Sequence, residues 1–130
     1  MKPIPENHTF SMRLRVTPAM TARFFDCEVH PLYATFALVE HAEYTARCVI
    51  LPYLEPEEDA VGSAVTVEHI GPAPVGAVVE IAATLAEIDG RKIVCDFTTR
   101  NGSDTIAAGT TTQHIVSKEK MNTKVRELSS

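Results

Sequence analysis

The longest pattern along the chain is helical and covers residues 31–53. At about 100° per residue, the apolar side chains of this segment fall on one side of a helix, in a stripe made of Phe36, Val39, Ala42, Ala46, Val49, Ile50 and Tyr53. Glu43 falls inside this stripe, between Phe36 and Ile50. A carboxylate at such a position is paired, protonated or used in chemistry. The helix is expected to end at or before Pro52, because proline lacks an amide donor and disfavours helical geometry in its predecessor.

Alternating apolar and polar positions predict strands on both sides of this helix. Residues 9–17 alternate cleanly and predict a half-buried strand that stops at Pro18. Residues 19–30 have no clean period and carry Phe24 and Phe25 side by side, so we expect a connecting segment with apolar anchors that covers a site. Four further strands are predicted after the helix, at residues 60–70, 75–88, 92–100 and 105–117.

The separators of the later strands predict antiparallel neighbours. Asp89-Gly90 and Asn101-Gly102 are strong signals for tight hairpins. The order of one strand, one long helix and four strands predicts an α+β fold, with the helix lying on a five-stranded antiparallel sheet in a single domain over residues 1–130. One helix cannot cover both faces and the edge of such a sheet. We therefore expect a homodimer with a two-fold axis and a shared, extended sheet.

Composition narrows the classes of partner. The net charge of −5 argues against nucleic acid as a partner, which requires basic residues gathered on one face. The exception is a basic cluster near the C-terminus, which is either a solvated tail or a contact for a phosphate-bearing ligand; it consists of Lys118, Lys120, Lys124 and Arg126. No apolar run approaches the roughly 20 residues of a membrane span, so no membrane partner is expected.

The cysteines and the first residues indicate a compartment. Cys27, Cys48 and Cys95 are odd in number and have no metal-ligand spacing. Residues 1–9 are polar and interrupted by proline, unlike a signal peptide. A reducing cytoplasm is the natural inference. With no metal-site pattern, no glycine-rich phosphate loop and no serine nucleophile elbow, we expect neither a metal nor a cofactor.

His69 is the first candidate partner for Glu43. It ends the strand at residues 60–70, and alternation from Val65 and Val67 places it on the face expected to meet the helix. A histidine at such a position is either a hydrogen-bonded structural residue or, beside a buried carboxylate, half of an acid/base or nucleophile pair. The competing interpretation of Glu43 is an ion pair of Arg47 with Glu43 or Glu40 along the helix.

Thr35 precedes the helical stripe and is a candidate N-cap. A helix N-terminus also offers unpaired backbone donors to an anion or a polarised carbonyl, so a cap residue can contact substrate as well. His41 falls on the opposite side of the helix from the stripe, where we expect it to be solvated.

Several short stretches between residues 35 and 126 also carry a family resemblance. They are Val39-Glu40, Pro52-Tyr53-Leu54-Glu55-Pro56, Val67-Glu68-His69, Pro74-Val75-Gly76, Asp89-Gly90-Arg91, Gly109-Thr110 and the run from Lys120 to Arg126. With them the sequence resembles the fluoroacetyl-CoA thioesterase family within the hot-dog thioesterases. The resemblance implies a hot-dog fold and hydrolysis of a short or small acyl-CoA thioester to the free acid and CoA.

The resemblance also implies roles for individual residues. Thr35, Glu43 and His69 match the family's catalytic threonine, glutamate and histidine, and Gly62 matches a backbone position at the acyl end of the pocket. Two departures argue against selectivity for the fluoroacetyl group. Gln113 stands where the fluoroacetyl enzyme has an arginine, and residues 23–35 are several residues shorter than its lid segment, with Val29 near the place of a gating phenylalanine.

The resulting hypothesis is that the Glu43 carboxylate attacks the thioester carbonyl or activates water to do so. His69 would orient it and exchange a proton around thiolate departure, and Thr35 would hold Glu43 or the developing oxyanion. Three alternatives stay open: a non-hydrolytic protein that binds an acyl-CoA or a small acid, a hydratase of enoyl thioesters, and a purely structural dimer.

Overall fold

The computed structural model describes residues 1–129, and its elements, two short 3-10 helices aside, follow the predicted order with two additions. In chain order they are β1 (Thr9–Arg15), the 3-10 helix η1 (Pro18–Met20), β2 (Thr21–Phe24), β3 (Cys27–Tyr33), α1 (Thr35–Ile50), the 3-10 helix η2 (Leu51–Tyr53), β4 (Glu58–His69), β5 (Val78–Asp89), β6 (Lys92–Asn101), β7 (Asp104–Ser117) and α2 (Lys118–Leu128). The additions are the β2–β3 hairpin and α2.

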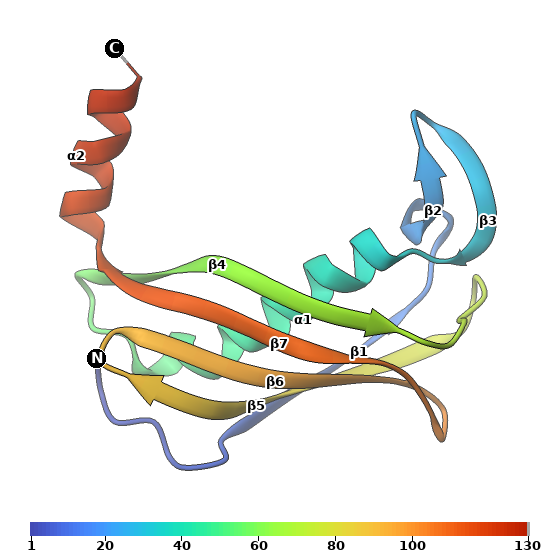
Figure 1. The fold of residues 1–130 in the computed structure, drawn as a ribbon, viewed down its shortest axis with the longest axis horizontal. Helices are drawn as coiled ribbons and strands as arrows, with labels where there is room; N and C mark the ends of the chain where they lie inside the picture. Colours follow the sequence, from blue (N-terminus) through green and yellow to red (C-terminus); the bar gives the residue numbers. More distant parts are fainter. Residues whose placement is uncertain (130) are drawn as a thin grey trace.

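Five strands form one antiparallel sheet in the order β1-β5-β6-β7-β4. Helix α1 runs along one face of this sheet (Figure 1). This arrangement confirms the predicted α+β fold with one helix on a five-stranded sheet. Strands β1 and β4 are the two edges of the sheet, so β4, which is adjacent to α1 in sequence, has one side without a strand partner within residues 1–129.

The core lies between α1 and the sheet. The buried side of α1 is mostly small and aliphatic, which lets the helix approach the strands closely; it consists of Ala37, Leu38, Ala42, Thr45, Ala46, Val49 and Ile50. Phe36, expected in the buried stripe, is instead 50% exposed. The buried face is therefore rotated away from Phe36, and Glu43 lies at its margin, where it is half-buried.

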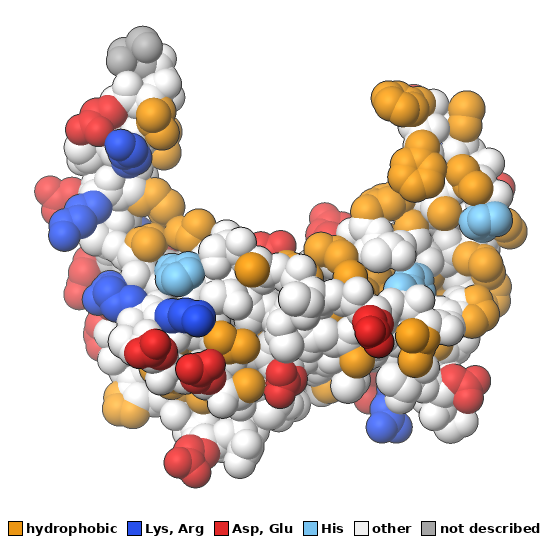
Figure 2. All heavy atoms as spheres, in the orientation of Figure 1, with side chains coloured by type: hydrophobic (Ala, Val, Ile, Leu, Met, Phe, Trp, Pro, Cys, Tyr) orange, Lys and Arg blue, Asp and Glu red, His pale blue; other side chains and the backbone are white. Residues whose placement is uncertain are grey.

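The segment between β1 and α1 corrects a prediction. Residues expected to be an irregular connection form the hairpin of β2 and β3, which projects from the end of the sheet (Figure 1). Phe24 is 62% exposed and Phe25 fully exposed, so neither anchors the segment. No turn was predicted here because Phe25 and Asp26 both have positive φ, a conformation usually taken by Gly or Asn. Figure 2 shows hydrophobic side chains gathered on this projection.

The C-terminal basic cluster lies on a helix. Helix α2 begins after Ser117, whose hydroxyl accepts a hydrogen bond from the Lys120 amide and so caps the first turn. It extends beyond the β4 edge of the sheet (Figure 1), and none of its residues is buried. None of the helices in the part of the chain described here is both long and apolar enough to span a membrane.

Candidate active site

The first group of site residues lies where α1 begins and β4 ends. Thr35 Oγ1 is 2.9 Å from His69 Nδ1. The predicted capping role of Thr35 is wrong, because Ala34 occupies the N-cap position and makes no side-chain cap. The Ala34 amide donates to the carbonyl of Met20, which fixes the chain just before the helix. Thr35 thus becomes the first helical residue, and its hydroxyl is available to His69.

Tyr33 and His41 extend this group, and neither was predicted to belong to it. The Tyr33 hydroxyl is 2.6 Å from His41 Nδ1, and the edge of its ring meets His69 at a centroid distance of 6.3 Å. Burial raises the pKa of Tyr33, and burial lowers the pKa of His41, opposed by the charge of Glu40. His41 is therefore not solvated as predicted. The sequence did contain a signal for this contact: His41 follows Tyr33, which leads into the helix, by about two helical turns.

Glu43 belongs to a second group, beside a cavity of about 450 Å³. The cavity lies between α1 and the strands β4 and β7, and its lining is Phe36, Val39, Glu40, Glu43, Tyr44, Arg47, Gly62 and Gln113. Within residues 1–129, the Glu43 carboxylate forms neither a hydrogen bond nor an ion pair. It is a half-buried anion that faces an open space.

The ion-pair interpretation of Glu43 is wrong. Arg47 instead donates to the Asp59 carboxylate at 2.8 Å and to the carbonyl of Ala60 at 2.7 Å. Two hydrogen bonds hold the pKa of Asp59 below its usual value: the larger effect comes from Arg47 and the smaller from the Ala60 amide. Arg47 is thereby fixed to the start of β4, and Glu43 is left without a protein partner among residues 1–129.

Gly62 provides the room that the carboxylate occupies. A Cβ at this position would collide with Glu43 Oε1 and would lie 3.2 Å from Cδ. A β-bulge decides which face of the sheet Gly62 lies on. The pairing of β4 with β7 skips Ser63, between Gly62 and Ala64. Strict alternation would place Gly62 and His69, seven residues apart, on opposite faces. The bulge reverses the alternation, so that both face α1.

Gln113 completes the second group. It is paired with Gly62 in the β4–β7 register and is only 2% exposed. Among residues 1–129, its Nε2 finds no hydrogen-bond partner. A buried amide donor without a partner is costly, and this one lines the same cavity as Glu43. The side chain is therefore suited to donate to a polar atom of a bound ligand.

The structure does not bring the two groups together within one chain. Thr35 and Glu43 are eight residues apart on α1, which corresponds to about 12 Å along a helix axis. Val29 lies on the exposed hairpin, where it is 53% exposed, and it does not line the Glu43 cavity. Among residues 1–129 there is no cluster of three or more His, Cys, Asp or Glu that could hold a metal ion.

Comparison with known proteins identifies the family. Residues 16–119 match the model of the fluoroacetyl-CoA-specific thioesterase family. The chain belongs to this family. The fluoroacetyl-CoA thioesterase of Streptantibioticus cattleyicolor is 33% identical over 100 residues, which cover 77% of this chain and 72% of the relative. The protein is thus a thioester hydrolase of the acyl-CoA thioesterase class.

Solved structures agree on the fold. A Thermus thermophilus protein described as a thioesterase superfamily member superimposes with a TM-score of 0.96 at 36% identity, covering 99% of this chain and 96% of that chain. A fluoroacetyl-CoA thioesterase structure gives a TM-score of 0.88 at 29% identity, with 97% and 98% covered. A hot-dog-like protein from Thermanaerovibrio acidaminovorans, 21% identical, gives 0.89 with 98% and 94% covered. The expected hot-dog fold is confirmed.

Proposed function

We propose that this thioesterase hydrolyses small acyl-CoA thioesters at a site that two protomers share, with Glu43 from one and Thr35 and His69 from the other. The observation that carries the proposal is the Glu43 carboxylate, which lines a cavity without a protein partner. Gly62 leaves space for it, and Arg47, the nearby cation on the same helix, is bonded elsewhere.

The free edge of β4 supports a shared site. An antiparallel pair of β4 strands, related by a two-fold axis, would continue the sheet across the dimer. In the register that sets Gly62 opposite His69 of the partner subunit, Glu43 of each protomer approaches the partner's Thr35 and His69. The two-fold symmetry would then form two complete sites. The separation of about 12 Å between Thr35 and Glu43 along α1 would no longer matter, because each site would take these residues from different protomers.

Exposed apolar side chains beside the cavity support the same interface. Phe36 is 50% exposed and Tyr44 is 55% exposed, and both line the Glu43 cavity. Large apolar side chains at the rim of a polar site are typical of surfaces that a partner covers. A second protomer would bury them and exclude water from Glu43, which strengthens every electrostatic interaction in the site.

The proposed chemistry uses protein groups and water, without a cofactor. Glu43 attacks the carbonyl carbon, or removes a proton from a water that does so; the C–S bond breaks, and CoA leaves as a thiolate. His69 delivers a proton to the thiolate. If Glu43 attacks, the acyl-Glu43 anhydride is then hydrolysed by water, and that water returns a proton to His69. If Glu43 acts as a base, the proton that it took from the attacking water passes on to His69, and both groups regain their starting states. The Thr35 hydroxyl, bonded to Nδ1, would orient the ring so that Nε2 faces the substrate. The structure thus favours His69 over Glu43 as the group that Thr35 holds.

Gln113 and the cavity would help to determine which acyl group the site accepts. The unpaired Nε2 of Gln113 would donate to a polar atom of the acyl group or to the thioester oxygen. Val29 and its hairpin would lie against the partner's site as a short lid. A mutant of the related fluoroacetyl-CoA thioesterase has been solved with acetyl-CoA, which makes acetyl-CoA a suitable first substrate here. The three free cysteines agree with a reducing cytoplasm as the place of action.

The direct test of the reacting group is Glu43→Gln, with thiol release from acetyl-CoA as the readout. Glu40→Gln is the matched control, because Glu40 lines the same cavity three residues away and its side chain is 79% exposed. We expect Glu43→Gln to lose activity by at least about a thousandfold, as removal of a nucleophile or base does, and the control to stay within about threefold. Equal activity of the two variants would disprove the role of Glu43.

Mixed dimers test whether the site is shared. Glu43→Gln and His69→Ala are each expected to be inactive alone. If a site takes Glu43 from one protomer and His69 from the other, a mixed dimer contains one intact site, and random 1:1 exchange restores about one quarter of the parent activity. Sites contained within single protomers would give no recovery on mixing.

A further inference from the structure

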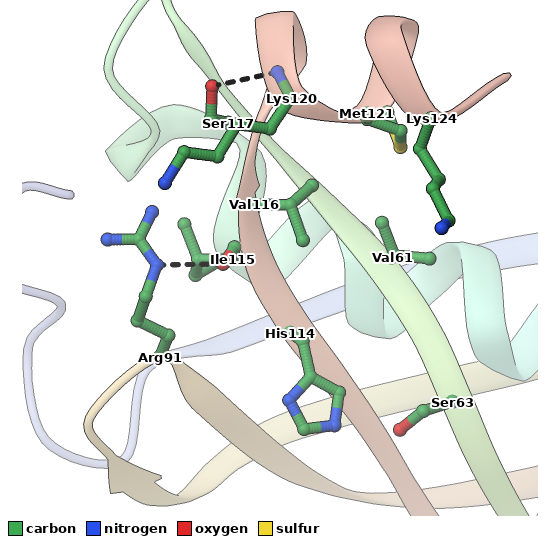
Figure 3. Close-up of a pocket in the computed structure, with 10 residues that line it drawn as sticks. All are labelled: Val61, Ser63, Arg91, His114, Ile115, Val116, Ser117, Lys120, Met121 and Lys124. Carbon is green, nitrogen blue, oxygen red and sulfur yellow. Dashed lines mark hydrogen bonds between the residues drawn. The ribbon is translucent and has the colours of Figure 1, made fainter. Parts of the chain in front are cut away.

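Two histidines near the start of α1 flank one buried tyrosine. Tyr33 is only 2% exposed, and its ring lies beside the rings of His41 and His69, at centroid distances of 5.8 and 6.3 Å. His114 has different surroundings, because it lines a cavity of about 800 Å³ between α2 and the strands β4 and β7 (Figure 3) and forms no side-chain hydrogen bond within residues 1–129. The chemistry proposed above uses His69 but gives no role to Tyr33 or His41.

Tyr33 joins the two elements that carry Thr35 and His69. Its amide donates to the carbonyl of Ala73 at 2.8 Å, in the segment that follows His69 and the end of β4. Its hydroxyl lies 2.6 Å from Nδ1 of His41, about two turns into α1. Because Thr35 begins the same helix, these two contacts of Tyr33 help to set the position of Thr35 relative to His69.

The hydrogen bond between Tyr33 and His41 has one direction at neutral pH. Burial, and to a smaller extent the charge of Glu40, raises the pKa of Tyr33, so the hydroxyl stays protonated and donates. Burial lowers the pKa of His41 against the opposing charge of Glu40, so the imidazole is neutral and its Nδ1 accepts. The side chain of His41 is only 16% exposed. Loss of either partner would therefore leave a poorly hydrated polar atom unpaired, which is costly.

The Tyr33 ring limits how the His69 ring can turn. The two rings meet at 72°, close to the edge-to-face arrangement that aromatic rings favour. The Thr35 hydroxyl, 2.9 Å from Nδ1, fixes one atom of the imidazole but leaves the ring free to tilt about that atom. Contact with Tyr33 removes this freedom and keeps Nε2 pointed in one direction. Proton transfer requires such a fixed direction, because small displacements of a reacting group are costly in rate.

We propose that Tyr33 and His41 act together as positioning residues for His69. The hydrogen bond from the Tyr33 hydroxyl to His41 holds the Tyr33 ring against His69, so that Nε2 of His69 faces the sulfur of the leaving group. The inference rests on the proposed function, because it assumes that His69 delivers a proton to the thiolate. It adds to that function two residues on which this proton transfer depends.

The test compares two acetyl thioesters that differ in their leaving group. The alkyl thiolate of CoA leaves more easily with a proton from His69, whereas thionitrobenzoate is a much more acidic aryl thiol that leaves without one. We expect Tyr33→Phe and His41→Leu each to lower kcat/KM for acetyl-CoA about tenfold, and to stay within about threefold of the parent with S-acetyl-thionitrobenzoate. The double variant should also lose about tenfold rather than a hundredfold, because the two residues act as a unit.

A conservative variant and a matched control complete the kinetic test. His41→Asn keeps an acceptor oxygen near the place of Nδ1 and should retain most of the activity. Tyr53→Phe removes the same hydroxyl from a tyrosine that also lies beside a histidine, His8 at 5.3 Å between ring centroids, at the other end of α1; it should change kcat/KM for neither thioester. Equal losses on the two thioesters, full activity of Tyr33→Phe, multiplied losses in the double variant, or no rescue by His41→Asn would overturn the proposal.

Nuclear magnetic resonance of the histidine rings tests the geometry without turnover. Tyr33→Phe and His41→Leu should each shift the ring resonances of His69, which are identified by their absence from His69→Ala, and Tyr53→Phe should leave them in place. Unchanged His69 resonances in the first two variants would also overturn the proposal. If His69→Ala hydrolyses acetyl-CoA as well as the parent does, the proposed function fails, while the resonances still decide whether Tyr33 and His41 hold the ring.

Discussion

The substitution Gly62→Ala should separate activity from stability. A Cβ at position 62 would collide with Glu43 Oε1 and lie 3.2 Å from Cδ and 3.9 Å from Cγ. These atoms are the far end of a flexible side chain, so the carboxylate rotates away while the backbone stays in place. A strained rotamer costs about 0.5–1.5 kcal/mol. Displacing a reacting group by about 1 Å costs on the order of a hundredfold in rate.

We therefore expect Gly62→Ala to lower kcat/KM about a hundredfold, or about 2.7 kcal/mol of transition-state stabilisation, while the strained rotamer lowers the free energy of unfolding by only about 0.5–1.5 kcal/mol. Gly109→Ala is the contrast. Its Cβ would collide with the backbone carbonyl oxygen of Thr66 and lie 2.9 Å from the buried ring of Phe97. Neither neighbour can rotate away, so overpacking should cost about 1–3 kcal/mol of folding free energy.

The assays are thiol release from acetyl-CoA and thermal denaturation of both variants. For a chain of this size, about 1 kcal/mol corresponds to a shift of about 4 °C, so Gly109→Ala should melt clearly lower than Gly62→Ala. The reasoning is refuted if Gly62→Ala keeps full activity. It is also refuted if that variant loses activity only in proportion to a loss of stability like that of Gly109→Ala.

Three further outcomes are expected. Because Arg47 lowers the pKa of Asp59 in the folded state, Asp59 adds stability above its unfolded pKa of about 4 that is lost as pH falls; melting curves of Asp59→Asn and the parent should converge in acid. Burial raises the pKa of Cys95 to about 11, so a disulfide reagent at neutral pH should modify it only after denaturation. Thr35→Val should lower kcat about fivefold, the equivalent of roughly 1 kcal/mol for its hydrogen bond to His69, whereas Thr35→Ser should keep it.

The order of elements was predictable because periodicity is a local property. The helical stripe predicted α1, observed at Thr35–Ile50, and the Asp-Gly and Asn-Gly pairs fall at the two tight turns, with Gly90 and Gly102 at positive φ. The β2–β3 hairpin escaped prediction because its turn uses Phe25 and Asp26 in the same unusual conformation. An exposed hairpin also lacks a buried face to impose alternation on its residues.

The candidate site was predictable as a set of residues but not as an arrangement. The place of Glu43 in the apolar stripe singled it out, and the family resemblance added Thr35 and His69. The ion pair of Arg47 with Asp59 could not be predicted from the helical pattern. Asp59 lies beyond the helix and meets Arg47 only after the chain turns back into β4. The environment of His41 was missed for the same reason, since Tyr33 reaches it only across the bend into α1.

The sequence by itself determined the α+β order and the single long helix, because hydrophobic spacing and turn residues act over a few positions. It also singled out Glu43 as a carboxylate within the apolar stripe of that helix. Only the tertiary structure decided which groups that carboxylate meets. The bulge at Ser63 turns Gly62 toward Glu43, and Arg47 pairs with Asp59 instead of Glu43. Within the described residues, one side of β4 has no strand partner. Each of these depends on strands that pair over long sequence separations, where a shift of one residue reverses the face of every side chain.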